Sequence, residues 1–238
     1  MLPEAVLICN FPEPSEQDPV LLSLNEVRTF FHEFGHLLHR IFSGKVQYAG
    51  MSRPEWDFVE APSELFEEWA LNPRVVSMFA RHYKTQEALP KKLAESLPSL
   101  DAVGRSLNVI WLLHRSALSL AHHDGSAGRE DLGKIAMEQA RRYLPYPILE
   151  GSHEQCSFGH LGNPGYASAY YTYLWSRVIA CDLFTAFDPG NLMNRAPMQR
   201  FRRLVLEPGG SMPAADLVKR FLGRPFNTEA FARWLKED

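Results

Sequence analysis

The sequence predicts a mainly α-helical protein with one short β element near the N-terminus. From Trp56 onward, apolar residues recur with the helical period, and segments rich in Gly and Pro separate the stretches. The composition, 45% apolar and 22% charged, is that of a globular protein. The β element is the apolar run AVLICNF, Ala5–Phe11, which a polar, Pro-rich loop follows.

The elements follow in order along the chain. Ser23 and Glu26 form a capping-box pattern, which predicts a helix starting just before Val27 and running to about Phe42. KVQYAGM, residues 45–51, is predicted as a second short strand. The remaining helices are expected near residues 62–72, 74–83, 102–122, 130–143, 166–187, 197–206, 213–222 and 227–236.

Length, charge and cysteine usage limit the functions that the chain can have. Its 238 residues suit one sizeable core, or two small domains at most. A net charge of −3 gives no electrostatic reason to expect nucleic acid or an anionic membrane as a partner. There is no apolar run of about 18 residues and no basic, apolar leader, so we expect neither a transmembrane helix nor a secretory signal. Three scattered cysteines favour reduced thiols in a cytoplasmic protein.

The predicted first helix carries an H-E-x-x-H pattern, His32-Glu33-Phe34-Gly35-His36. On a helical wheel the histidines occupy one face, and the Phe and Leu side chains occupy the other. Imidazoles at i and i+4 can reach one tetrahedral metal ion, and an adjacent glutamate can act as general base on a metal-activated water. His39, one turn further on, is interpreted as a packing residue.

A catalytic zinc usually has three protein ligands, and the segment EWDFVEAPSELFEEW can supply the third. Glu60 is the candidate, but Glu64 and Glu67 share its helical face, so geometry alone does not choose among them. Pro62 predicts a helix start or a kink around Glu60. Asp57 could fix the tautomer of a liganding imidazole, or it could be a helix N-cap.

A stripe of tyrosines follows the loop GHLGNPG. Tyr166, Tyr170 and Tyr173 stand at i, i+4 and i+7, a spacing that more often indicates core packing than function. A hydroxyl, or the imidazole of His160 in the loop, could instead donate to the oxyanion that forms when water adds to a peptide carbonyl.

Three motifs in this order resemble the thimet oligopeptidase family of zinc metallopeptidases, which includes oligopeptidase A and dipeptidyl carboxypeptidase. FHEFGHLLH and DFVEAPSELFEEW resemble its active-site helices, and FGHLGNPGYASAYYTYLW resembles its FGH…GGY…YY.YLW segment. The resemblance implies a helical, zincin-like catalytic domain over residues 1–238 that binds one Zn²⁺ through His32, His36 and Glu60. It implies Glu33 as general base.

The same resemblance implies that the loop and the tyrosine stripe line the cleft. Tyr166, Tyr173 and His160 are then the groups that meet the scissile carbonyl, while Tyr170 and Gly165 contact the substrate. Two positions depart from the family pattern: Glu64 replaces a glutamine, and Pro164 replaces the first glycine of a Gly-Gly pair. The resemblance also implies that residues 1–238 correspond to the C-terminal catalytic part, without the N-terminal half that forms the opposite wall of the substrate channel in longer relatives.

The sequence thus predicts a cytoplasmic zinc endopeptidase that acts on oligopeptides and, with one channel wall absent, on longer unfolded polypeptides. The alternative is a non-catalytic, zinc-stabilised remnant or a binding domain that needs a partner chain. A helical protein with a chance H-E-x-x-H pattern is the third interpretation, and it would bind no metal. The oligomeric state is left open, with self-association over the exposed cleft as one option.

Overall fold

The computed structural model describes residues 3–15, 19–44, 46–125, 128 and 131–236. Over these residues the backbone is mainly helical, as predicted, and it contains no β-strand. The predicted N-terminal β element is therefore wrong: Ala5–Phe11 has no regular structure, and Val6 and Ile8 are 83% and 82% exposed. An apolar run becomes a strand only where a neighbouring strand pairs with its backbone, and the described residues supply none here.

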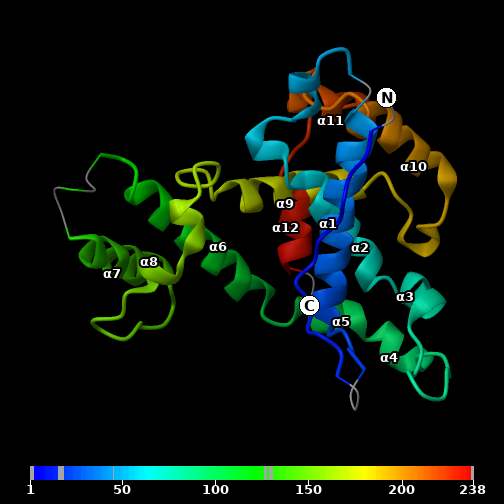
Figure 1. Cartoon of the computed structure of the whole chain (residues 1–238), viewed down its shortest axis with the longest axis horizontal. Helices are drawn as coiled ribbons and strands as arrows, with labels where there is room; N and C mark the ends of the chain where they lie inside the picture. The colour runs from blue at the N-terminus through cyan, green and yellow to red at the C-terminus, as the bar shows by residue number, and fades with distance from the viewer. Residues whose placement is uncertain (1–2, 16–18, 45, 126–127, 129–130, 237–238) are drawn as a thin grey trace. The chain divides into compact units, whose positions relative to one another are not determined.

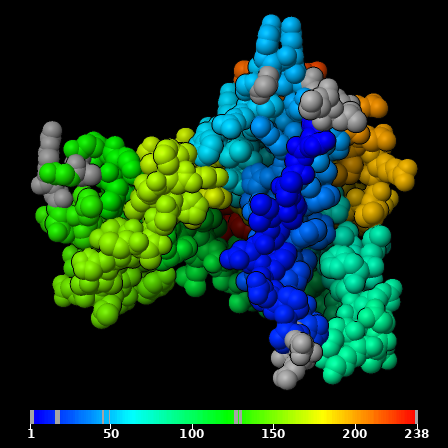
Figure 2. All heavy atoms as spheres, viewed as in Figure 1, coloured from blue at the N-terminus to red at the C-terminus, as the bar shows by residue number. Residues whose placement is uncertain are grey.

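The predicted second strand is also absent from the described residues. Val46–Tyr48 forms bends, and η1 (Ala49–Ser52) is a 3₁₀ turn, while Lys45 lies outside the described residues. The N-terminal segment instead lies along the first helix. A Cβ on Gly44 would meet Pro3, and the charge of Glu33 acts on Cys9. Figure 2 shows this segment, in dark blue, on the face of the molecule that it draws.

Helix α1 (Leu24–Ser43) begins at the predicted capping box. Glu26 N donates to Ser23 Oγ at 3.3 Å, and Ser23 N donates to Glu26 Oε2 at 2.7 Å, so both amides at the helix start are satisfied. Helix α2 (Ala61–Leu71) begins directly after Glu60, with Pro62 in its first turn, where a missing N–H costs nothing. The predicted helix start at Glu60 is confirmed.

Each of the eight later helices that were predicted is present, and their order is as predicted, but several bounds differ. The long segment predicted over 166–187 is helical only from residue 172, and the segment predicted over 74–83 ends at residue 79. Three short helices, two between residues 91 and 102 and one at residues 154–157, were not predicted. The bounds are α3 (Pro73–Phe79), α4 (Lys91–Glu95), α5 (Leu97–Ala102), α6 (Arg105–Ala121), α7 (Leu132–Tyr143), α8 (Glu154–Ser157), α9 (Thr172–Phe184), α10 (Arg195–Phe201), the π-helical turn η5 (Arg202–Leu206), α11 (Ala214–Leu222) and α12 (Glu229–Lys236).

The chain divides into two compact units, residues 1–103 with 176–238, and residues 104–175. In the first unit α1 and α2 lie side by side, and α1 also contacts η5 (Figure 1). Its core includes Phe58, Leu65, Leu183, Phe201 and Phe221, all at most 1% exposed. This core holds α2 against α1, which positions the candidate site. The single domain predicted over residues 1–238 stays a prediction.

The second unit has a smaller core of its own. Leu118 of α6, Ala136 of α7 and Phe158 are buried together, with Leu161 and Tyr170 packed against them. No helix among the described residues is long and apolar enough to cross a bilayer.

Candidate metal centre

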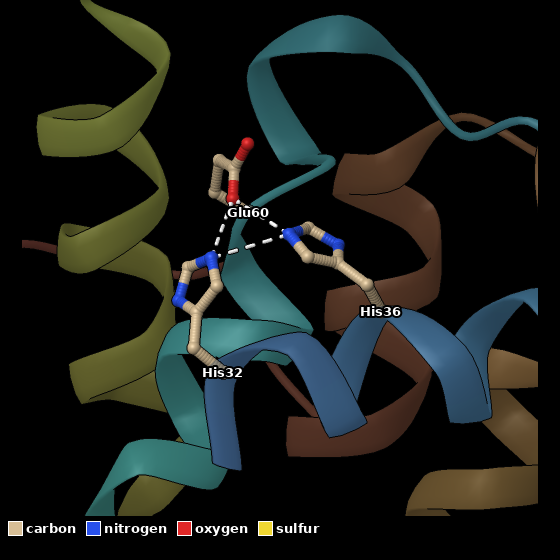
Figure 3. Close-up of side chains that lie close together, drawn as sticks. All are labelled: His32, His36 and Glu60. Atoms are coloured by element: carbon tan, nitrogen blue, oxygen red, sulfur yellow. Dashed lines mark hydrogen bonds and ion pairs between the residues drawn. The ribbon is translucent and has the colours of Figure 1, made fainter. Parts of the chain in front are cut away.

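The side chains of His32, His36 and Glu60 converge on one point of the first unit (Figure 3). The two histidines stand one turn apart on α1, and Glu60 stands at the start of α2 without capping it. His36 Nε2 lies 3.2 Å from His32 Nε2 and 3.0 Å from Glu60 Oε2. His32 Nε2 lies 3.2 Å from the same carboxylate oxygen. Three ligands of the kinds that hold a catalytic zinc are therefore gathered at one place.

These distances fit a divalent cation. Ligand atoms about 2.0–2.1 Å from a tetrahedral zinc are about 3.3 Å apart, which is close to the 3.0–3.2 Å separations observed here. Two imidazole nitrogens this close would point their lone pairs at each other. They therefore need either a proton or a metal ion between them. Glu60 is only 1% exposed, so its carboxylate is costly to bury unless it is paired. The residues present fit a zinc ion.

Gly35 explains how α1 and α2 approach closely enough to form this site. A Cβ at this position would lie 2.6 Å from Ser63 Cα and 3.1 Å from the Phe66 ring. Only a residue without a side chain fits there. Ser63 in turn donates its hydroxyl to the Glu60 carbonyl at 2.8 Å, which steadies the backbone that carries the carboxylate.

Glu67 holds the far side of the His32 ring. His32 Nδ1 donates to Glu67 Oε1 at 2.8 Å, which leaves the lone pair of Nε2 directed toward Glu60 and His36. Burial alone would lower the pKa of His32, but its hydrogen bonds to Glu60 and Glu67 and the charges of both carboxylates raise that pKa to about 10. The site therefore attracts positive charge strongly, and protons and a metal ion compete for it.

Two arginines fix Glu67 in turn. Arg28 Nη2 of α1 and Arg177 Nη2 of α9 each donate to Glu67 Oε2 at 2.8 Å. These two charges, together with the His32 hydrogen bond, hold the pKa of Glu67 well below its ordinary value against the opposing effect of burial. Arg28 also donates to Asp101 Oδ1 at 2.6 Å, so its guanidinium is shared by two carboxylates. Glu67 is thus an ionised, anchored acceptor.

The structure separates the three glutamates among which the sequence could not choose. Glu60 reaches both imidazoles, whereas Glu67 faces only the outer nitrogen of His32. Glu64 Oε2 lies 3.3 Å from Arg177 Nε, away from the histidines. Burial raises the pKa of Glu64, and the charge of Arg177 offsets this only in part.

Three other predicted residues lie in the same unit. Glu33 is half-buried on α1 beside His32, and its charge acts on Cys9, whose pKa is raised by burial first and by Glu33 second. Ser176 Oγ donates to the backbone carbonyl of Asp57 at 3.1 Å. Within the described residues no hydrogen bond joins the Asp57 carboxylate to His32 or His36. His39 is 5% exposed, as a packing residue would be.

The second unit gathers the predicted loop and tyrosine residues. The Tyr166 and Tyr173 rings are stacked with centroids 5.5 Å apart, and Tyr170 lies 4.9 Å from Tyr173. The His160 ring contacts all three, and Tyr173 Oη lies 3.4 Å from His160 Nε2. Gly165 N donates to Asn163 Oδ1 at 3.0 Å, which tightens the loop before Tyr166. Tyr170 also contacts Phe158, so it belongs to the core of this unit as well.

Sequence reasoning missed the orienting carboxylate. Glu67 is named there only as a possible ligand, and Arg28 and Arg177 are not named at all. The sequence feature that could have indicated these residues is the apolar helix APSELFEEW, which contains more glutamates than one metal site needs. Excess carboxylates on a buried helix require cationic partners, and Arg28, on the histidine helix, was one accessible candidate.

Fold and site together define a helical protein with a zincin-type site of two histidines and a glutamate. The chain belongs to the Peptidase family M3, whose family model matches residues 1–237.

Three relatives show how much of such proteins this chain represents. It is 38% identical to a thimet-like oligopeptidase from Dictyostelium discoideum, over 97% of this chain and 35% of that protein. It is 34% identical to oligopeptidase A from Escherichia coli, over 93% of this chain and 33% of the relative. It is also 34% identical to saccharolysin from Saccharomyces cerevisiae, over 98% of this chain and 33% of the relative. The chain spans about a third of the length of these relatives.

Proposed function

We propose that this chain hydrolyses peptide bonds in oligopeptides as a zinc-dependent endopeptidase. The observation that carries the proposal is the convergence of His32 Nε2, His36 Nε2 and Glu60 Oε2, whose mutual distances suit one tetrahedral cation. Membership of Peptidase family M3 and the names of its oligopeptidase relatives support the choice of substrate.

Each residue of the site then has a definite task. His32, His36 and Glu60 hold one Zn²⁺, which when bound lowers the pKa of water toward neutrality and polarises a carbonyl. Glu33 takes the proton of the attacking water and delivers it to the leaving amine. Glu67 keeps the His32 ring in the tautomer that presents Nε2, the task that the sequence suggested for Asp57.

The loop and the tyrosines stabilise and orient the substrate in this proposal. Tyr166, Tyr173 and His160 donate hydrogen bonds to the oxygen of the carbonyl under attack, and one such donor contributes about 3 kcal/mol to the transition state. Tyr170 and Gly165 border the bound peptide. The ring contacts among these residues support their action as one group.

Exchange of Glu33→Gln tests the proposal. Cleavage of an internally quenched peptide should fall at least about 100-fold, since a general base contributes about 10²–10⁴-fold, while bound zinc and thermal stability stay unchanged. A matched control is Glu95→Gln, an exposed glutamate of α4 paired with Lys91, which should retain full activity. A chelator should abolish cleavage and added zinc should restore it.

Turnover that survives Glu33→Gln would contradict the assignment of the general base. One zinc per chain with no hydrolysis of any peptide would favour the zinc-stabilised binding domain instead. No bound metal would show that the H-E-x-x-H pattern has no catalytic meaning.

A further inference from the structure

A cavity of about 420 Å³ adjoins the metal centre on the side of His36. It lies wholly within the first unit, and its walls come from the C-terminal half of α1 and from the segment between η1 and α2. This volume is within the range of small-ligand sites and can receive an amino-acid side chain or a chain terminus. His36 lines the cavity and also places its Nε2 3.0 Å from Glu60, so the cavity and the proposed cation site share this residue.

The charge of this cavity is wholly positive. Arg40 and Arg53 line it, and none of its described lining residues is acidic. Arg40 Nη1 donates to Ser52 Oγ at 3.0 Å, which uses one of its five N–H groups. The exposed Arg53 guanidinium has no hydrogen-bond or ion-pair partner within the described part of the chain. Two guanidinium groups with no acidic residue among the described lining favour the binding of an anion. This positive charge is local, because the chain as a whole has a net charge of −3.

The rest of the wall is neutral or apolar. His39 is uncharged, because burial, and then the nearby His36, lower its pKa to about 4. Its Nε2 is buried with no hydrogen-bond partner among the described residues. Trp56 and Val59 supply an apolar surface against which methylene groups can pack. A carboxylate on a short aliphatic stem matches both parts of the cavity better than a phosphate or a bare ion.

A second cavity, of about 340 Å³, lies beside the other histidine, His32, and it is lined by Arg28 and Glu67. That arginine is already bound by Glu67 and Asp101, so it has little capacity for a ligand. Of these two cavities, the one beside His36 is therefore the one with positive charge available to a ligand.

We propose that this cavity is a specificity site for a substrate carboxylate located within a residue or two of the bond that is cleaved. The inference rests on the proposed peptidase function and adds a preference to it. The carboxylate is that of an Asp or Glu side chain, whose short stem packs on the apolar wall while its oxygens bind Arg53 and Arg40.

A matched set of peptides tests the proposal with the full chain loaded with zinc. One pair carries Glu or Gln at each position flanking the cleaved bond, and a control pair has a free or an amidated C-terminus one or two residues beyond it. We expect kcat/KM to be at least about 10-fold higher for the Glu peptide at one position, as for a charge-assisted hydrogen bond. A preference shown only by the free C-terminus would contradict the assignment to a side chain.

Substitutions then assign the preference to the cavity. Arg53→Gln should reduce it to within about twofold while cleavage of the neutral peptides stays unchanged, and Arg53→Lys should retain part of it. Arg195→Gln, an equal loss of charge at another exposed position of the same unit, should leave it intact. Equal cleavage of both members of every pair, or a preference that survives both Arg53→Gln and Arg40→Gln, would overturn the proposal.

A binding measurement separates this inference from the proposed function. If no peptide is cleaved, the peptidase proposal fails, but the cavity is still tested by the binding of fluorescent carboxylate and amide peptides to the zinc-loaded chain. Tighter binding of the carboxylate peptide that Arg53→Gln removes supports the cavity as a carboxylate site. Equal binding of both peptides rejects it.

Discussion

Glu67 Oε1 lies 2.8 Å from His32 Nδ1, so a buried carboxylate accepts the proton on the side of the ring that faces away from Glu60. The hydrogen bond fixes which nitrogen of His32 has a free lone pair, and it fixes the ring plane. Arg28 and Arg177 hold Glu67 from the other side. The position of the His32 ring therefore depends on ionised side chains that do not themselves bind the metal, namely Glu67 and the two arginines.

Replacing Glu67 should weaken zinc binding without removing a ligand. We expect Glu67→Gln to raise the zinc Kd about 10–100-fold, because outer partners of metal-liganding histidines typically contribute that much. The measurement is a competition for zinc with a fluorescent chelator. Glu67→Asp should retain part of the affinity, because it keeps the charge but shortens the side chain.

A neighbouring glutamate provides the control. Glu68→Gln changes a carboxylate on the same helix that approaches Arg177 only to 4.0 Å and contacts no histidine, so its zinc Kd should equal that of the parent. An unchanged Kd in Glu67→Gln would mean that the hydrogen bond to His32 does not organise the ligand.

Gly35 should be intolerant of even one extra carbon. In Gly35→Ala the new Cβ would lie 2.6 Å from Ser63 Cα, a backbone atom that cannot yield cheaply. We expect a loss of about 1–3 kcal/mol of stability from this overpacking, and weaker zinc binding as α1 separates from α2. Thermal unfolding and chelator competition measure the two effects. Gly50→Ala, where a Cβ would meet nothing within 4 Å, should change neither, and equal behaviour of the two variants would refute the steric argument.

The local part of the site could be predicted from the sequence. His32 and His36 stand one turn apart in any helix that contains them, and the capping box and Pro62 set the starts of the two helices that carry the ligands. These features depend on residues close together in the chain. The close approach of α1 and α2 depends on Gly35. Its importance could not be predicted from the sequence alone, because it becomes clear only once α2 is seen to pack against this position.

The rest depends on contacts between distant segments. Arg177 reaches Glu67 from 110 residues further along the chain, and no spacing rule connects them. The β element was predicted wrongly because a strand also depends on a distant partner. Ala5–Phe11 has strand-like residues, but it lies beside α1 instead of another strand. The turns at residues 166–171 also interrupt the predicted helix, and there Ala169 N donates to Tyr166 O and Thr172 N to Ala169 O, bonds that join residues three apart instead of four.

Tyr173 should affect turnover and not the metal. If its hydroxyl donates to the carbonyl oxygen under attack, Tyr173→Phe should lower kcat about 100-fold, equivalent to about 3 kcal/mol, with an unchanged zinc Kd. Steady-state kinetics with an internally quenched peptide, together with metal analysis, provides the test. Tyr171→Phe, a neighbouring tyrosine that is 41% exposed, should retain full kcat. A normal kcat in Tyr173→Phe would remove this hydroxyl from the mechanism.

Glu68 should make the fold less stable as the pH rises. Burial raises its pKa from 4.5 to about 7, with Arg177 opposing and Glu67 adding to the shift. The folded chain therefore keeps a proton that the unfolded chain releases, so the penalty is absent below about pH 4.5 and complete above about pH 7. Because the side chain is 22% exposed, we expect solvent to limit the penalty to about 1–2 kcal/mol. Glu68→Gln cannot ionise, so its stability relative to the parent should increase between pH 5 and pH 8 in urea unfolding. The difference between the two proteins is the informative quantity, since it cancels the titration of every other group. A difference that stays constant over this range would show that Glu68 is already ionised in the fold at pH 5.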